Sequence, residues 1–223
     1  MNFDLSYFIE LIPLLLRYLG ITMQMALLGL VFALLLAVVM AVVRVFRVPL
    51  LDWLVQLYIS FFRGTPLLVQ LFLLYYGLPQ MFPPLVGIDA FTAAVIGLSL
   101  HFSAYMAESI RAAIIGIDRS QMEAALSIGQ SPLMAMRRII LPQAARIALP
   151  SLMNQFVDMI KSTSLAFTLG VAELMARAQM EASSSFKFFE SFLAVALIYW
   201  VVVVLFTRLQ LRLETKLNRA YQR

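Results

Sequence analysis

The stretch EAALSIGQSPLMAMRRIILP (residues 123–142) poses the fold problem of this chain, because it is a polar, helix-forming segment between long apolar runs. Its first part is rich in small residues, and Gly129 and Pro132 then interrupt the helix. A second helix is expected from Met134, with two adjacent arginines, and Pro142 is expected to close it. A flexible tether would be richer in Gly, Ser and Pro, so the stretch predicts two short helices joined by a fixed turn.

The composition of the whole chain is that of an integral membrane protein. Of its 223 residues, 62% are hydrophobic and 13% are charged, with a mean hydropathy of +0.90. Soluble domains carry about 25% charged residues. Apolar runs such as 27–43 do not alternate with a period of two, so they favour helices over barrel strands. We therefore expect one all-α transmembrane domain over residues 1–223. The absence of cysteine excludes disulfides and Cys-ligated metals.

Five membrane spans are expected, and none of them is expected to be broken or repeated. The predicted spans cover about residues 13–43, 65–78, 91–110, 149–170 and 188–206. The short aromatic segment 49–62 is expected to lie at the membrane interface. Thr65 is the predicted N-cap of the second span, with Pro66 in its first turn.

The basic residues predict the orientation of the chain. With the N-terminus outside, thirteen of the seventeen Lys and Arg residues fall in inner loops or the C-terminal tail. The outer side keeps Arg17, Arg177 and Lys187, while Lys161 lies within a span. The positive-inside rule then gives an outer N-terminus and a cytoplasmic C-terminus. Residues 115–146 become a cytoplasmic loop, and the net charge of +5 needs no nucleic acid to explain it.

Polar residues in the fourth span have two interpretations. Asp158 and Lys161 are three residues apart, so they can neutralise each other on one helix face. Asn154 and Asp158 are four apart and can line a cavity with Ser162. Charged groups at this depth face protein or water rather than lipid.

In the third span, His101 and Tyr105 are one turn apart and can both contact a zwitterion. A packed, hydrogen-bonded histidine is the alternative. Glu108 and Arg111 are expected to form a structural pair near the inner surface.

The motifs of nucleotide binding and of common hydrolases do not occur. The chain has no Gly-x-x-x-x-Gly-Lys-Ser/Thr phosphate loop, no His-Glu-x-x-His and no Gly-x-Ser-x-Gly. The chain therefore does not bind ATP in that mode. Two functions that need none of these motifs are an ion-gradient-driven transporter or channel subunit, which would use Asp158 and Lys161, and an intramembrane enzyme that uses Asp158.

The spacing of the opening stretch resembles a known loop. Glu-Ala-Ala, three residues, Gly, nine residues and then Ile-x-Leu-Pro resembles the EAA loop of permease subunits in ABC importers. In that family the loop forms a coupling helix, which docks into a cleft of the cytoplasmic ATPase. The resemblance implies a coupling role for Glu123, Ala124, Ala125, Ser127, Gly129 and Ser131.

Other segments are similar to one subfamily, the permeases for polar amino acids. They are FFRGTPLLVQLFLLYYGLP (61–79), SAYMAESIRAAI (103–114) and IKSTSLAF (160–167). The resemblance covers about residues 13–215, and the L-cystine-type permeases look most similar. Many relatives have Asn where this chain has His101, and Phe102 also departs from their pattern.

The resemblance implies an ABC type-1 transmembrane domain in a bacterial inner membrane. It implies as partners a cytoplasmic ATPase dimer, which binds ATP and Mg, a second permease copy or paralogue, and an extracytoplasmic solute-binding protein. The chain itself is expected to have no catalytic residue, cofactor or metal. His101, Tyr105, Asn154, Asp158 and Ser162 are the candidate ligands of a polar amino acid such as cystine, arginine, glutamine or histidine.

Overall fold

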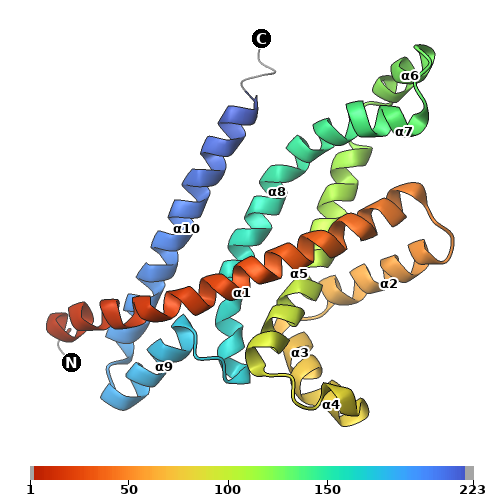
Figure 1. Ribbon diagram of the computed structural model, residues 1–223. Helices are drawn as coiled ribbons and strands as arrows, with labels where there is room; N and C mark the ends of the chain where they lie inside the picture. The colour runs from red at the N-terminus through yellow and green to blue at the C-terminus, as the bar shows by residue number, and fades with distance from the viewer. Residues whose placement is uncertain (1–2, 219–223) are drawn as a thin grey trace.

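The computed structural model describes residues 3–218 of the chain, with side chains for residues 3–216, and every regular element in this part is helical (Figure 1). The elements are α1 (Leu5–Phe46), α2 (Leu51–Gly64), α3 (Leu67–Phe72), the π-helical turn η1 (Leu73–Gly77), α4 (Leu78–Met81), the 3-10 turn η2 (Pro83–Leu85), α5 (Ala90–Ile115), α6 (Arg119–Ser127), α7 (Pro132–Ala135), the π-helical turn η3 (Met136–Ile140), α8 (Leu141–Ser162), the 3-10 turn η4 (Thr163–Leu169), α9 (Leu174–Ser185) and α10 (Phe188–Asn218). The prediction of an all-α chain is confirmed.

The core is built where α1 crosses α5. Small residues line both helices at this crossing, among them the buried Ala33 and Ala37 of α1 and Ala93 and Ala94 of α5. In lipid, helices gain little from burying apolar surface against each other, so small residues that let backbones approach drive their association. Large apolar side chains point outward instead: Val39 of α1 is 63% exposed, as expected for a surface that contacts lipid.

The predicted second span (65–78) is one half of a broken helix pair, and the segment predicted to lie at the interface (49–62) forms the other half. α2 and the helical stretch that begins at Leu67 are bent by 111° across a short break. Thr65 does not cap α3 as predicted. Its backbone is extended, its hydroxyl donates to the carbonyl of Phe61 (2.8 Å), and Pro66 stands between it and the first residue of α3. Pro66 has no N–H for a continuous helix, which is why the helix ends before it.

Length and composition identify fewer spans than the five predicted. Within residues 3–218 three helices qualify, α1, α5 and α10. The bent pair of α2 and the helical stretch 67–81 makes a fourth span if it crosses the membrane as one unit. Helix α8 lies at the fourth predicted position, but it ends at Ser162 and a 3-10 turn continues to Leu169. The polar residues of α8 lower its mean hydropathy, and α8 is not among the helices that qualify as spans. In a membrane these polar residues would have to face protein or water rather than lipid.

The loop predicted between spans three and four is a helical hairpin at one end of the molecule, the same end as the C-terminal part of α10 (Figure 1). Asp118 is the N-cap of α6, and its side chain accepts a hydrogen bond from the backbone N–H of Ser120. Pro142 does not close the following helix. It is the second residue of α8, which continues the π-helical turn η3 without a break, and the wider π-helical turn just before Pro142 accommodates its missing N–H.

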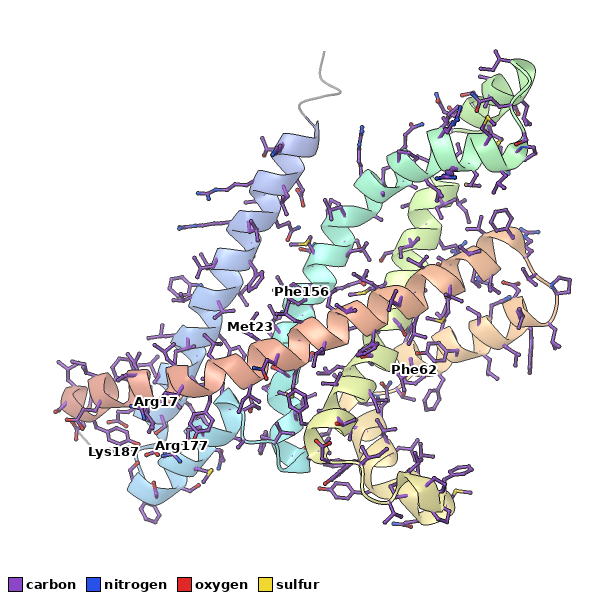
Figure 2. All side chains as sticks on the ribbon, viewed as in Figure 1. Arg17, Met23, Phe62, Phe156, Arg177 and Lys187 are labelled. Atoms are coloured by element: carbon purple, nitrogen blue, oxygen red, sulfur yellow. The ribbon has the colours of Figure 1, made fainter. Side chains whose placement is uncertain are left out.

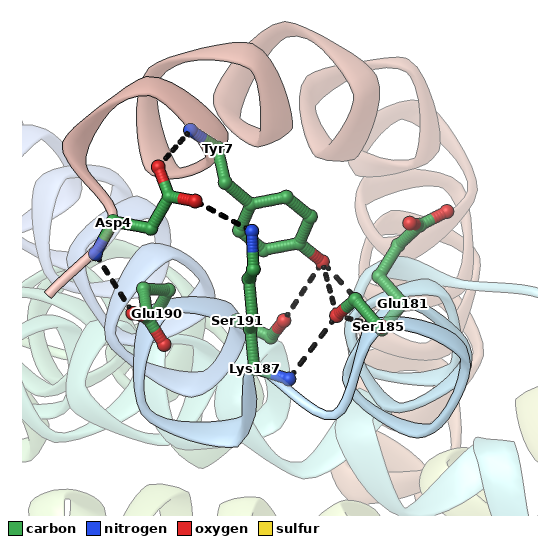
Figure 3. Close-up of polar contacts among 7 residues, drawn as sticks. All are labelled: Asp4, Tyr7, Glu181, Ser185, Lys187, Glu190 and Ser191. Atoms are coloured by element: carbon green, nitrogen blue, oxygen red, sulfur yellow. Dashed lines mark hydrogen bonds and ion pairs between the residues drawn. The ribbon is translucent and has the colours of Figure 1, made fainter. Parts of the chain in front are cut away.

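At the opposite end, polar contacts join the start of α1 to the turn between α9 and α10 (Figure 3). Lys187 Nζ lies 2.5 Å from Asp4 Oδ2, and the backbone N–H of Asp4 donates to Glu190 Oε1 (3.0 Å). The hydroxyl of Ser185 donates to Tyr7 Oη (2.9 Å). This end also holds the three basic residues predicted to lie outside, Arg17, Arg177 and Lys187 (Figure 2).

A buried carboxylate ties three helices together near the same end. Glu173, at the N-cap of α9, is fully buried, and burial raises the pKa of its carboxyl group. It accepts hydrogen bonds from the backbone N–H of Ala176 (2.8 Å), from the Thr22 hydroxyl (3.3 Å) and from the Tyr199 hydroxyl (3.2 Å). Helices α1, α9 and α10 therefore share one acceptor.

We expect Glu173→Ala to lower the free energy of unfolding by about 3 kcal/mol, because it leaves three donors without their acceptor at about 1 kcal/mol each. The thermal midpoint of the detergent-solubilised chain measures this loss. Glu10→Ala is the matched control, since Glu10 is exposed on α1, and it should shift the stability by no more than about 0.5 kcal/mol. Equal midpoints for the two variants would contradict the role of Glu173.

Candidate functional site

A polar cavity of about 550 Å³ lies between α5 and α8, within the range of small-ligand sites. It brings together four of the five candidate ligands predicted from sequence. The residues that line it are His101, Phe102, Tyr105, Gln155, Asp158, Lys161, Ser162, Ser164 and Leu165.

On the α5 side, His101 and Tyr105 lie one helical turn apart, with ring centroids 5.1 Å from each other. The Arg63 guanidinium lies 5.4 Å from the centre of the Tyr105 ring, a cation–π contact from the end of α2. The histidine is hydrogen bonded, since its Nδ1 lies 2.9 Å from Gln70 Oε1 of α3. The cavity wall is thus connected to both halves of the broken helix.

On the α8 side, Asp158 and Lys161 form the ion pair that their spacing predicts. Lys161 Nζ lies 2.6 Å from Asp158 Oδ1. Both side chains are more than half exposed, at 54% for Lys161 and 58% for Asp158. The predicted structural pair also forms, as Arg111 donates to Glu108 outside this cavity.

Asn154 is not among the residues that line the cavity. Its Oδ1 accepts a hydrogen bond from Gln210 of α10 (3.2 Å), which holds its side chain against another helix. Gln155, which is not among the predicted ligands, lines the cavity instead and donates to Ser109 (2.7 Å) and Ser151 (3.3 Å). Helical spacing alone could not show which of these adjacent residues lines the cavity, because Asn154 bonds to α10 and Gln155 bonds to α5.

The second candidate surface is the tip formed by α6 and α7. Asp118 accepts from the backbone N–H of Ser120 (2.8 Å), which holds the pKa of its carboxyl group below the ordinary value. At the other end of α6, the N–H of Gly129 donates to Leu126 O (2.9 Å) and the N–H of Gln130 donates to Ala125 O (3.1 Å). This is a Schellman motif, and Gly129 takes its left-handed position with φ +81°.

The tip exposes large apolar side chains although it lies outside the transmembrane helices. Their exposed fractions are 43% for Leu126, 75% for Ile128, 75% for Leu133 and 41% for Met134. Apolar groups gathered in this way mark interaction surfaces.

The six predicted coupling residues all lie on the tip, in two different environments. Glu123, Ala124, Ser127, Gly129 and Ser131 are exposed, whereas Ala125 is only 2% exposed and packs inside the hairpin. The Ser131 side chain caps α7 by accepting from Met134 N–H (3.3 Å). Ala125 therefore supports the shape of the tip rather than its outer face.

Residues 29–219 match the family model described as binding-protein-dependent transport system inner membrane component. The match spans the broken helix, the cavity and the α6–α7 tip. It confirms the resemblance drawn from the EAA loop.

Curated relatives agree with this match. The chain is 75% identical over 223 residues to the probable amino-acid ABC transporter permease protein PatM of Vibrio harveyi. The alignment covers 100% of this chain and 100% of that protein. It is 41% identical over 209 residues to the L-cystine transport system permease protein TcyL of Bacillus subtilis (strain 168), or 92% of this chain and 87% of that one.

A crystal structure of an amino acid ABC transporter with histidines has the same fold, with a TM-score of 0.89 and 35% identity over 97% of this chain and 100% of that one. The predicted ABC type-1 transmembrane fold is thereby confirmed. The chain belongs to the family of inner membrane components of binding-protein-dependent transport systems, as a permease subunit of an ABC importer.

Proposed function

We propose that this permease subunit carries a polar amino acid through the cavity between α5 and α8. The observation that carries the proposal is a cavity with both signs of charge, Asp158 and Lys161, in a chain that otherwise has few charged residues. The names of its relatives, which refer to amino-acid and L-cystine transport, support the same substrate class.

The exposed ion pair matches the two charged groups of an amino acid. An incoming zwitterion can replace the contact between Asp158 and Lys161, its ammonium against the carboxylate and its carboxylate against the lysine. His101, Tyr105 and Ser162 then contact the rest of the molecule from the same cavity. Asn154 is left out of this ligand set, because it bonds to Gln210.

The exposure of the pair also supports a second permease subunit. A charged side chain that is more than half exposed cannot face lipid without a large cost, so protein or water covers it in the membrane. A second copy of the chain, or a paralogue, set against α8 would enclose the cavity. Its two halves would then alternate in access between the two sides of the membrane.

The α6–α7 tip is the proposed contact with the ATPase subunits. Its exposed apolar side chains fit a hydrophobic cleft, and its Schellman turn fixes the shape that enters the cleft.

In this proposal ATP and Mg bind to the partner ATPase dimer. The tip and the C-terminus are cytoplasmic, and a solute-binding protein docks at the end that holds α9. Residues 1–223 act as one transmembrane domain, with its core at about 13–215.

An ion-driven carrier or channel subunit is the second candidate, because the break between α2 and α3 is typical of such proteins. Dependence on ATP separates the two candidates.

The test uses the complex that a tag on this chain isolates from its own cells. We expect an ATPase with a phosphate loop to copurify, and its activity in lipid, with the binding protein, to rise severalfold with one amino acid of a panel. Uptake that survives ATP depletion, with no ATPase in the isolated complex, would favour the ion-driven candidate.

A further inference from the structure

Gln70 connects the broken helix to the cavity through a chain of hydrogen bonds. The residue is 5% exposed and lies on α3. Its Nε2 lies 3.0 Å from the carbonyl oxygen of Phe62, 3.0 Å from that of Thr65 and 2.8 Å from the Thr65 hydroxyl. Its Oε1 lies 2.9 Å from His101 Nδ1.

The reason for this arrangement lies in the sequence of the break. In a continuous helix the N–H of residue 66 would donate to the carbonyl of Phe62, but Pro66 has no N–H. The Gln70 amide supplies the missing donor to the same carbonyl. It thereby gives a donor to a backbone carbonyl that the break deprives of its helical partner.

The surroundings of Gln70 also fix which way its amide points. Two carbonyl oxygens can only accept, and the Thr65 hydroxyl has already given its proton to Phe61 O (2.8 Å). The amide end that faces these three acceptors must be the NH₂ group. A flipped amide would set its oxygen against them, so the oxygen faces His101.

We propose that Gln70 is a positioning residue, which holds His101 in the tautomer with the proton on Nδ1 and turns an unprotonated Nε2 toward the cavity. An amide oxygen can only accept, so the proton of the contact lies on Nδ1. The neutral ring then has one polar atom left, and that atom is a hydrogen-bond acceptor. The ring therefore accepts a hydrogen bond from a donor group of the amino acid, such as an ammonium, amide or guanidinium, and does not bind a carboxylate.

The tautomer can be measured directly because His101 is the only histidine of the chain. The full chain, carrying a tag without histidine, is labelled with ¹⁵N-histidine and studied by NMR in lipid nanodiscs at about pH 8, above the ordinary pKa of imidazole. We expect the ring proton on Nδ1 in the wild type and on Nε2, the form preferred in water, in Gln70→Leu. Gln155→Leu is the matched control in the same cavity and should keep the proton on Nδ1.

A wild-type ring with its proton on Nε2 would overturn the proposal, and so would a tautomer that Gln70→Leu leaves unchanged. The wild-type measurement requires no variant, so it decides the matter even if Gln70→Leu fails to fold.

A second arm, which rests on the proposed function, measures transport by the complete complex. Gln70→Leu should raise the KM for the transported amino acid about tenfold, with kcat within about twofold, because one ligand hydrogen bond is lost. A fall in kcat alone would point to a purely structural role for Gln70 and contradict the proposal. The NMR arm stands whether or not an amino acid is transported, so failure of the proposed function and failure of this inference are distinguishable.

Discussion

Gly129→Glu should lower substrate-stimulated ATPase activity of the assembled complex about 100-fold. Gly129 has φ +81°, where an L-residue costs about 1–2 kcal/mol, and a charged side chain on the tip adds the cost of a disrupted contact. About 3 kcal/mol in total corresponds to this factor. The measurement is ATPase activity in lipid with the amino acid present, at equal amounts of permease in the membrane.

Gly87→Glu is the control for Gly129→Glu. Gly87 has φ +111°, and an added Cβ would meet no atom within 4 Å at either glycine. Both variants therefore carry backbone strain and an exposed charge, but Gly87 lies in the loop at the other end of the molecule. The two variants are compared by the ATPase activity of the complex without binding protein, because that protein is proposed to dock at the end of the molecule that holds Gly87. We expect Gly87→Glu to keep most of this activity and Gly129→Glu to lose it. Equal activities of the two variants would mean that the tip does not couple to an ATPase.

The second large effect is expected for Asp158→Asn, which should reduce uptake of the amino acid about 10- to 100-fold. The substitution keeps the size of the side chain but removes the charge that the substrate ammonium contacts, a bond worth about 1.5–3 kcal/mol. Uptake into proteoliposomes with the complete complex measures it. Glu108→Gln is the matched control, because Glu108 also pairs with a basic residue three positions away but lies outside the cavity. It should transport within about threefold of the wild type.

A charge swap separates substrate binding from ion pairing alone. In the double variant Asp158→Lys with Lys161→Asp, the pair can form again with its charges exchanged. If Asp158 served only to neutralise Lys161, the double variant would regain uptake. We expect it to remain as inactive as Asp158→Asn, because the exchanged charges would place a lysine against the substrate ammonium and an aspartate against the substrate carboxylate.

The helical class, the α6–α7 hairpin and the family can all be predicted from the sequence. These features depend on neighbours in the chain: long apolar runs form helices in lipid, and Gly129 and Pro132 end and restart helices through their own backbones. For the same reason the Asp158–Lys161 pair could be predicted from its spacing. The EAA spacing is also a local pattern, and it indicates the permease family without any tertiary contact.

Which polar side chains share the cavity, and how the helices on either side of Pro66 are joined, depends on the tertiary structure. Asn154 and Asp158 have the spacing of one helix face, yet only Asp158 lines the cavity, because Gln210 of a distant helix binds Asn154. The sequence predicts Thr65 as an N-cap, but its hydroxyl donates to the carbonyl of Phe61 and accepts from the Gln70 amide instead. The partner of His101 is likewise 31 residues away in the chain. Contacts between distant residues depend on how helices pack, and no local pattern in the sequence encodes them.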